Sequence, residues 1–126
     1  MQRIEQDWFG ARAGFAVDWS LQVVGERLEF AFECGCPAAC EEVTGFVEGL
    51  WQRDVAEFFL VANNGSYQEF NLSPTGAWWS ARFRSYRQQE CACPCSSVVT
   101  TAARSRSGWK ASLSVAVGEV VAWQRF

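Results

Sequence analysis

The chain has 126 residues and a formal net charge of −3, which fits one mildly acidic domain and gives no electrostatic reason to bind nucleic acid. It contains no histidine, and this excludes a Ser-His-Asp triad, a Cys-His dyad and His ligation of zinc or haem. Seven Trp, ten Phe and two Tyr indicate a binding surface more than a reaction centre.

The first residues, Met1 to Asp7, alternate charged and polar types where a secretory signal would need an apolar run. No apolar window is long enough to cross a bilayer. We therefore expect a cytoplasmic protein that makes no contact with membranes. No repeat, low-complexity tract or linker divides the sequence, so we expect a single domain over residues 1–126.

Short segments of alternating polarity predict β-strands along the chain. The first two strands are expected at residues 21–24 and 28–34, on either side of a turn at Gly25. Further strands are expected at residues 55–62, 67–72, 78–87, 98–102 and 109–117, with turns at 63–66 and 73–76. Without a convincing amphipathic helix, this pattern predicts an all-β fold, an antiparallel β-sandwich.

The side-chain period of two assigns three consecutive strands to faces of one sheet. If Phe58 and Phe70 point into the core, Glu57 and Asn71 point outward. On the third strand, we place Trp79, Ala81 and Phe83 in the core. The predicted outer face then carries Glu57, Tyr67, Glu69, Asn71, Trp78, Ser80, Arg82, Arg84 and Tyr86.

Such a face suits a sugar, because the C–H groups of a pyranose pack on flat rings and its hydroxyls need planar hydrogen-bonding partners. The alternative is that the charged residues form cross-strand ion pairs on a solvated sheet, with the aromatic residues raising strand propensity.

Two motifs in this region resemble the centre of the family 9 carbohydrate-binding modules, a DOMON-like family. Residues 49–60 read GLWQRDVAEFFL and fit the pattern LW-x-x-D-x-x-E-x-F-L. Residues 67–79 read YQEFNLSPTGAWW and fit the pattern Y-x-E-F-N-x-S-P-x-G-x-W. The resemblance implies a jelly-roll sandwich, binding of a mono- or oligosaccharide on an aromatic-lined face, and no catalysis.

The resemblance also implies roles for single residues. The expected sugar contacts are Trp51, Glu57, Asn71 and Trp78, followed by Trp79, Arg82 and Tyr86. Pro74 and Gly76 are expected only to make a turn. Asp54 is expected to anchor a loop or to help bind a structural calcium ion, as in some relatives. No other cofactor is expected. Haem in particular is not expected, because the chain has no histidine and Met1 is its sole methionine.

Related domains continue past the strand that residues 109–117 resemble. We therefore expect a sandwich that lacks its last strand. The sheet edge left without a partner would suit a homodimer.

Six cysteines form two groups outside these motifs. They are Cys34, Cys36 and Cys40 in the first group, and Cys91, Cys93 and Cys95 in the second. Their spacing is not that of a zinc ribbon. Three interpretations stay open: disulfides between two loops at one end of the sandwich, a thiophilic ion such as Zn²⁺ or Cu⁺ held by both groups, and reduced thiols without a common role.

Three other functions compete with non-catalytic sugar binding. A thiolate metal-binding or redox protein would use the cysteines, and a ligand-free structural domain would use the fold alone. A glycosidase would need two carboxylates across a cleft, for which Asp54, Glu57 and Glu69 are the candidates. The small chain and the shallow face of a sandwich argue against the glycosidase.

Overall fold

The computed structural model describes residues 2–6, 12–92 and 94–120. Its strands and 3₁₀ turns are β1 (Gln2–Gln6), β2 (Arg12–Val24), β3 (Arg27–Cys34), η1 (Leu50–Gln52), β4 (Ala56–Val61), β5 (Tyr67–Leu72), β6 (Trp78–Ser85), β7 (Gln88–Ala92), β8 (Val99–Arg104), β9 (Trp109–Ala116) and η2 (Val117–Glu119).

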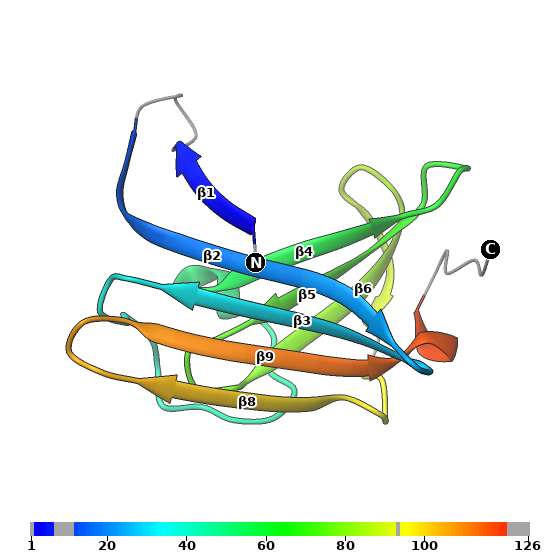
Figure 1. The fold of residues 1–126 in the computed structure, drawn as a ribbon. Helices are drawn as coiled ribbons and strands as arrows, with labels where there is room; N and C mark the ends of the chain where they lie inside the picture. The colour runs from blue at the N-terminus through cyan, green and yellow to red at the C-terminus, as the bar shows by residue number, and fades with distance from the viewer. Residues whose placement is uncertain (1, 7–11, 93, 121–126) are drawn as a thin grey trace.

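The strands form two antiparallel sheets that face each other (Figure 1). One sheet has five strands in the order β1-β2-β3-β9-β8, and the other has four in the order β4-β5-β6-β7. The predicted antiparallel β-sandwich is therefore confirmed. Below, the outer face of the four-stranded sheet means the face turned away from the five-stranded sheet.

Aromatic rings from both sheets fill the space between them. The ring centroids of Phe30 on β3 and Phe58 on β4 are 4.6 Å apart. Phe58 in turn stacks on Phe70 of β5, with their ring centroids 4.8 Å apart. Leu28, Leu72, Leu113 and Val115 are buried around these rings. The prediction that Phe58 and Phe70 point into the core is confirmed.

The strand boundaries follow the sequence pattern where one face of a strand is buried. β5 spans the predicted residues, and β4, β8 and β9 lie within two residues of them. β7 was not predicted, because all five of its residues are exposed and no apolar alternation marks it. Neither β1 nor the first half of β2 was predicted, and the described side chains of β1 are exposed as well.

The predicted facing of β6 is wrong by one residue. Trp78 pairs with Leu72 and Ser80 pairs with Phe70, so Trp78, Ser80 and Arg82 point toward the five-stranded sheet. Trp78 is only 8% exposed and belongs to the core between the sheets.

The cause of this error is that both sides of β6 are covered. Leu50, Val43, Val47 and Val55 pack on the outer face against Trp79 and Ala81, so the outward set is also apolar. On the inner side, the buried Ser80 hydroxyl accepts a hydrogen bond of 2.9 Å from the amide Nε2 of Gln68. Hydropathy alone could not distinguish these two faces.

The predicted turn between β5 and β6 is confirmed and joins the two sheets. Gly76 has a φ of 85°, and its N–H donates to the carbonyl of Ser73 at 3.0 Å. The hydroxyl of Thr100 on β8 donates to the carbonyl of Gly76 at 2.7 Å. A Cβ atom added at Gly76 would lie 3.1 Å from that hydroxyl, so both the backbone angle and the close approach favour glycine.

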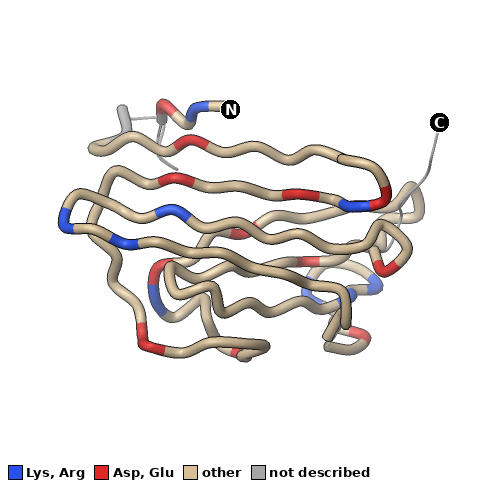
Figure 2. The backbone as a smooth tube through the Cα atoms, turned by 60° about the horizontal axis from the view of Figure 1, so that its bottom comes forward, with Lys and Arg blue, Asp and Glu red and all other residues tan. Residues whose placement is uncertain are grey.

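Figure 2 shows that the Lys, Arg, Asp and Glu positions are distributed along the strands and turns of both sheets. In the part of the chain that the structure describes, no helix is long and apolar enough to span a bilayer.

We expect Trp78→Ala to lower the free energy of unfolding by about 3 to 5 kcal/mol, because it removes a buried aromatic side chain from the core. Trp51→Ala is the control, since Trp51 is 64% exposed and its loss should cost less than about 1 kcal/mol. Urea denaturation of both variants measures the difference. Equal losses would contradict the inward position of Trp78.

Candidate functional site

The outer face of the four-stranded sheet gathers acidic and aromatic side chains from three strands. Directly paired residues of antiparallel strands share a face, so the register fixes the rows of this surface. The rows are Glu57, Asn71 and Trp79; Phe59, Glu69 and Ala81; and Val61, Tyr67 and Phe83. We call Glu57, Phe59, Tyr67, Glu69, Asn71 and Phe83 the outer-face cluster.

Three rings of the cluster form an apolar ridge across the strands. Tyr67 and Phe83 stack with their centroids 4.8 Å apart, and Phe59 meets Tyr67 edge-on at 6.1 Å. Phe59 is 49% exposed, whereas Tyr67 and Phe83 are half-buried. The ridge therefore offers ring surface to a ligand beside the acidic residues.

Two carboxylates of the cluster have no partner among the described residues. Glu57 and Glu69 make no hydrogen bond and no ion pair there. Loss of hydration by partial burial raises the pKa of Glu57 above its usual range. Burial raises the pKa of Glu69 as well, and the nearby charge of Glu57 raises it further.

Asn71 adds a third oxygen acceptor, directly across from Glu57. Its side chain is 1% exposed, and its Oδ1 atom has no hydrogen-bond partner in the described part of the chain. A buried amide oxygen without a donor costs free energy. The β4, β5 and β6 positions on this face carry no Lys or Arg, so oxygen acceptors outnumber donors across the cluster.

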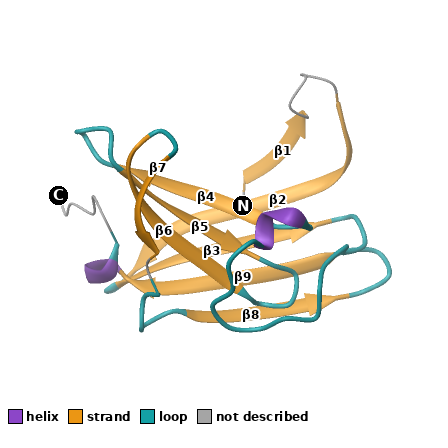
Figure 3. Cartoon of the chain, turned by 180° about the vertical axis from the view of Figure 1, so that it is seen from behind, coloured by secondary structure: helices purple, strands orange, loops and turns teal. Residues whose placement is uncertain are grey.

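Residues 35–55 form a segment that covers one end of this face. Its turn η1 lies over the four-stranded sheet, as Figure 3 shows from behind. Leu50 is buried against Trp79, Ala77 and Ala81, while the next residue, Trp51, is exposed to solvent. Trp51 therefore stands at the border of the outer face.

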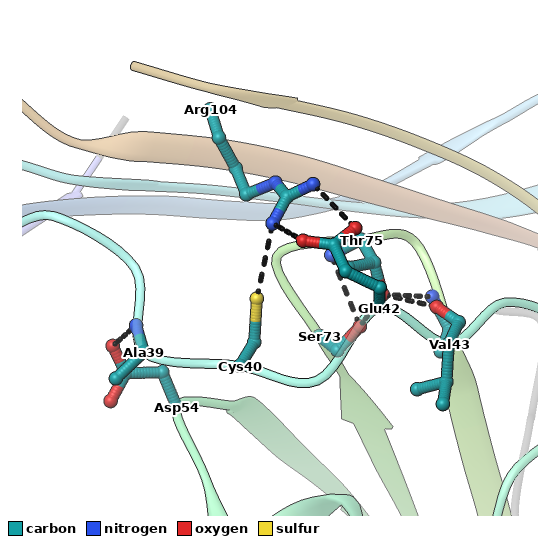
Figure 4. A network of polar contacts seen from close by, with 9 residues as sticks. Ala39, Cys40, Glu42, Val43, Asp54, Ser73, Thr75 and Arg104 are labelled. Carbon is teal, nitrogen blue, oxygen red and sulfur yellow. Dashed lines mark hydrogen bonds and ion pairs between the residues drawn. The ribbon is translucent and has the colours of Figure 1, made fainter. Parts of the chain in front are cut away.

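An ion pair to β8 holds this covering segment in place (Figure 4). The guanidinium of Arg104 binds both carboxylate oxygens of Glu42, at 2.5 and 2.8 Å, and its Nη1 atom also donates to the sulfur of Cys40 at 3.5 Å. This guanidinium lowers the pKa of Glu42. The hydroxyl of Thr75 donates to the carbonyl of Val43 at 2.5 Å and fixes the segment to the β5–β6 turn.

Asp54 links the two ends of the same segment through hydrogen bonds to Ala39. Its Oδ2 atom accepts from the N–H of Ala39 at 2.9 Å, and its own N–H donates to the carbonyl of Ala39 at 2.9 Å. Of the two roles expected for Asp54, these contacts show the loop anchor. Within residues 2–6, 12–92 and 94–120, no group of three Cys, Asp or Glu is arranged to hold a metal ion.

The structure brings together only part of the predicted site. Glu57 and Asn71 lie side by side on the outer face, Trp79 lies in the same row under Leu50, and Trp51 stands at the border. Trp78 and Arg82 point toward the five-stranded sheet, contrary to the prediction. Tyr86 lies in the β6–β7 turn, 76% exposed, with the guanidinium of Arg87 5.1 Å from its ring centre.

Phe59 and Phe83 are members of the cluster that the sequence reasoning missed. Phe59 follows Glu57 by two residues and therefore shares its face, which the alternation could have indicated. Phe83 was assigned to the core through the error in β6. Tyr67 and Glu69 lie on the outer face as predicted.

Cys34 and Cys95, one from each cysteine group, lie at opposite ends of β9. Cys34 pairs with Trp109 at the start of this strand, whereas the thiol of Cys95 lies 3.7 Å from the carbonyl oxygen of Glu119 beyond its end. Eight residues of strand, about 25 Å, separate the two positions. Of the three interpretations left open for the cysteines, those that need both groups at one end of the sandwich are therefore contradicted for Cys34 and Cys95. Cys93 lies outside the described residues.

No protein-family model and no curated protein matches the chain. Among solved structures, it is similar to a proposed carbohydrate-binding protein from Bacteroides uniformis, with a TM-score of 0.76 and 11% sequence identity. The match covers 99% of this chain and 63% of that protein, so the chain spans less than two thirds of its length. At this identity, the likeness shows a shared β-sandwich fold.

We expect Glu69→Gln to raise the free energy of unfolding at neutral pH by about 0.5 kcal/mol, the size of a cross-strand like-charge interaction. The raised pKa of Glu69 means that the folded chain holds a proton more tightly than the unfolded chain. Its charge thus destabilises the fold above that pKa, and stability returns as the pH falls through it.

Urea denaturation at neutral pH, and again below the usual glutamate pKa, measures this effect. The gain should vanish at the lower pH. Glu29→Gln, on β3 of the other sheet, is the control and should change stability by less. A loss of stability in Glu69→Gln would show that the carboxylate has a stabilising partner.

Proposed function

We propose that this chain is a non-catalytic carbohydrate-binding domain whose ligand lies on the outer-face cluster. One observation carries the proposal: exposed Glu57 and half-buried Glu69, which have no partner among the described residues, stand beside exposed Phe59 and the half-buried rings of Tyr67 and Phe83 on a single sheet face. A face that only closed the fold would be expected to pair a half-buried carboxylate such as Glu69. The cost of these carboxylates in stability is consistent with a surface kept for a ligand.

The chemistry of the cluster matches that of a pyranose. The C–H face of a sugar ring would pack on Phe59 or Trp51, which are the exposed rings at this face. The ring hydroxyls would donate hydrogen bonds to the carboxylates of Glu57 and Glu69. Hydrogen bonds to charged acceptors in a partly dehydrated site are stronger than those between neutral groups.

The resemblance to family 9 modules supports the same surface. Of the four sugar contacts that it implies first, Trp51, Glu57 and Asn71 lie on or beside this surface, whereas Trp78 lies in the core. We therefore propose a jelly-roll relative of these DOMON-like modules, with a mono- or oligosaccharide as partner. The structural neighbour's description as a carbohydrate-binding protein agrees with this proposal.

The arrangement of the carboxylates argues against hydrolysis. A glycosidase places its two carboxyl groups on opposite sides of the bond that it breaks. Glu57 and Glu69 project from neighbouring strands of one sheet face, so both would lie on the same side of a bound sugar. The third candidate, Asp54, is engaged by the backbone of Ala39.

We expect Phe59→Ala to weaken sugar binding about tenfold or more, because it removes an exposed ring from the cluster. Phe15→Ala is the matched control: Phe15 is 47% exposed, but it lies on β2 of the other sheet. Titration calorimetry against a panel of glucose, xylose and short β-linked oligosaccharides measures both. No saturable heat from any sugar, or an equal loss in both variants, would contradict the proposal.

A further inference from the structure

We propose that the outer-face cluster selects sugars by charge, and that its preferred ligand is an amino sugar with a free ammonium group. This inference rests on the proposed function and names the class of sugar that the same face would take. Two features of the cluster favour such a ligand: its excess of hydrogen-bond acceptors over donors, and two charges that no side chain of the described residues neutralises.

The cluster presents oxygen acceptors to its ligand. Ionised Glu57 and Glu69 can only accept hydrogen bonds, so a ligand that satisfies them must bring N–H or O–H groups. The Oδ1 atom of Asn71 is buried directly across from Glu57 and lacks a donor among the described residues, so it adds a negative dipole there and is not itself a contact atom. An ammonium group brings three donors at one position, whereas a hydroxyl brings one.

The charges of the cluster also favour a cation. Glu57 and Glu69 act on each other electrostatically, and among the described residues no positive side chain offsets either of them. Arg84, from the far end of β6, is 3.6 Å from Glu90 and is engaged there. An ammonium group placed between the two carboxylates would relieve their repulsion, and partial burial would strengthen this attraction. A uronic acid would add a third carboxylate and would be repelled.

The aromatic ridge favours an organic cation over a metal ion. Calcium takes six to eight oxygen ligands, whereas the charged oxygens of the cluster come from two side chains, Glu57 and Glu69. The rings of Phe59, Tyr67 and Phe83 lie beside those acceptors. Such rings pack on the C–H groups of a sugar and attract a nearby positive charge.

Calorimetric titrations of the unmodified chain with glucosamine, glucose, N-acetylglucosamine and glucuronate test the inference. Just below neutral pH, where the amine of glucosamine is charged, glucosamine should bind about tenfold more tightly than glucose. N-acetylglucosamine has no ammonium charge and should bind with about the affinity of glucose. Glucuronate should have the lowest affinity of the four. Added salt should reduce the differences in affinity among the four sugars, because it screens the charges of the cluster.

Two variants assign the preference to the cluster. In Glu69→Gln, the affinity for glucosamine should fall to within about twofold of the affinity for glucose. Glu29→Gln, on the other sheet, should keep the preference for glucosamine. Glucosamine and glucose binding equally to the unmodified chain would overturn the charge selection and leave the proposed sugar binding standing. Binding of none of the four sugars would overturn both. Displacement of glucosamine by equimolar calcium would identify the cluster as a metal site and overturn the inference.

Discussion

The packing of Phe30, Phe58 and Phe70 between the sheets is the constraint on which the functional surface depends. The ring centroids of Phe30 and Phe58 are 4.6 Å apart and those of Phe58 and Phe70 are 4.8 Å apart, so the three rings join β3 of one sheet to β4 and β5 of the other. Because side chains alternate along a strand, burying Phe58 and Phe70 forces their neighbours Glu57 and Glu69 to the opposite face. A slip of one residue would bring the carboxylates into the core, at a prohibitive cost in hydration.

The outer face therefore combines residues that the fold places there with residues that the fold does not need. Leu50 and Trp79 close one end of this face, and the pair Arg104–Glu42 holds the covering segment over it. Beyond that covered end, Glu57 and Glu69 repel each other and lose hydration. A ligand with hydroxyl or ammonium donors would offset both costs, and this links the electrostatics of the surface to its proposed function.

The sequence alone was sufficient for the fold class and for the facing of β4 and β5. Strands with one buried face, such as β5, showed clear alternation, and this alternation placed Glu57, Glu69 and Asn71 correctly. It failed on β6, where Trp78 and Trp79 are both buried, one between the sheets and one under Leu50. It could not choose among the three interpretations of the cysteines, because the distance along β9 between Cys34 and Cys95 follows from strand order, which short-range patterns do not contain.

The central claim is that a sugar binds the outer face of the four-stranded sheet. Titration of the ¹⁵N-labelled chain with glucosamine, followed by amide chemical-shift mapping, tests it most directly. The account predicts that the largest shifts fall on β4, β5 and η1, around Glu57, Phe59 and Glu69. Shifts confined to the five-stranded sheet, or to the loop of Cys34, Cys36 and Cys40, would contradict it.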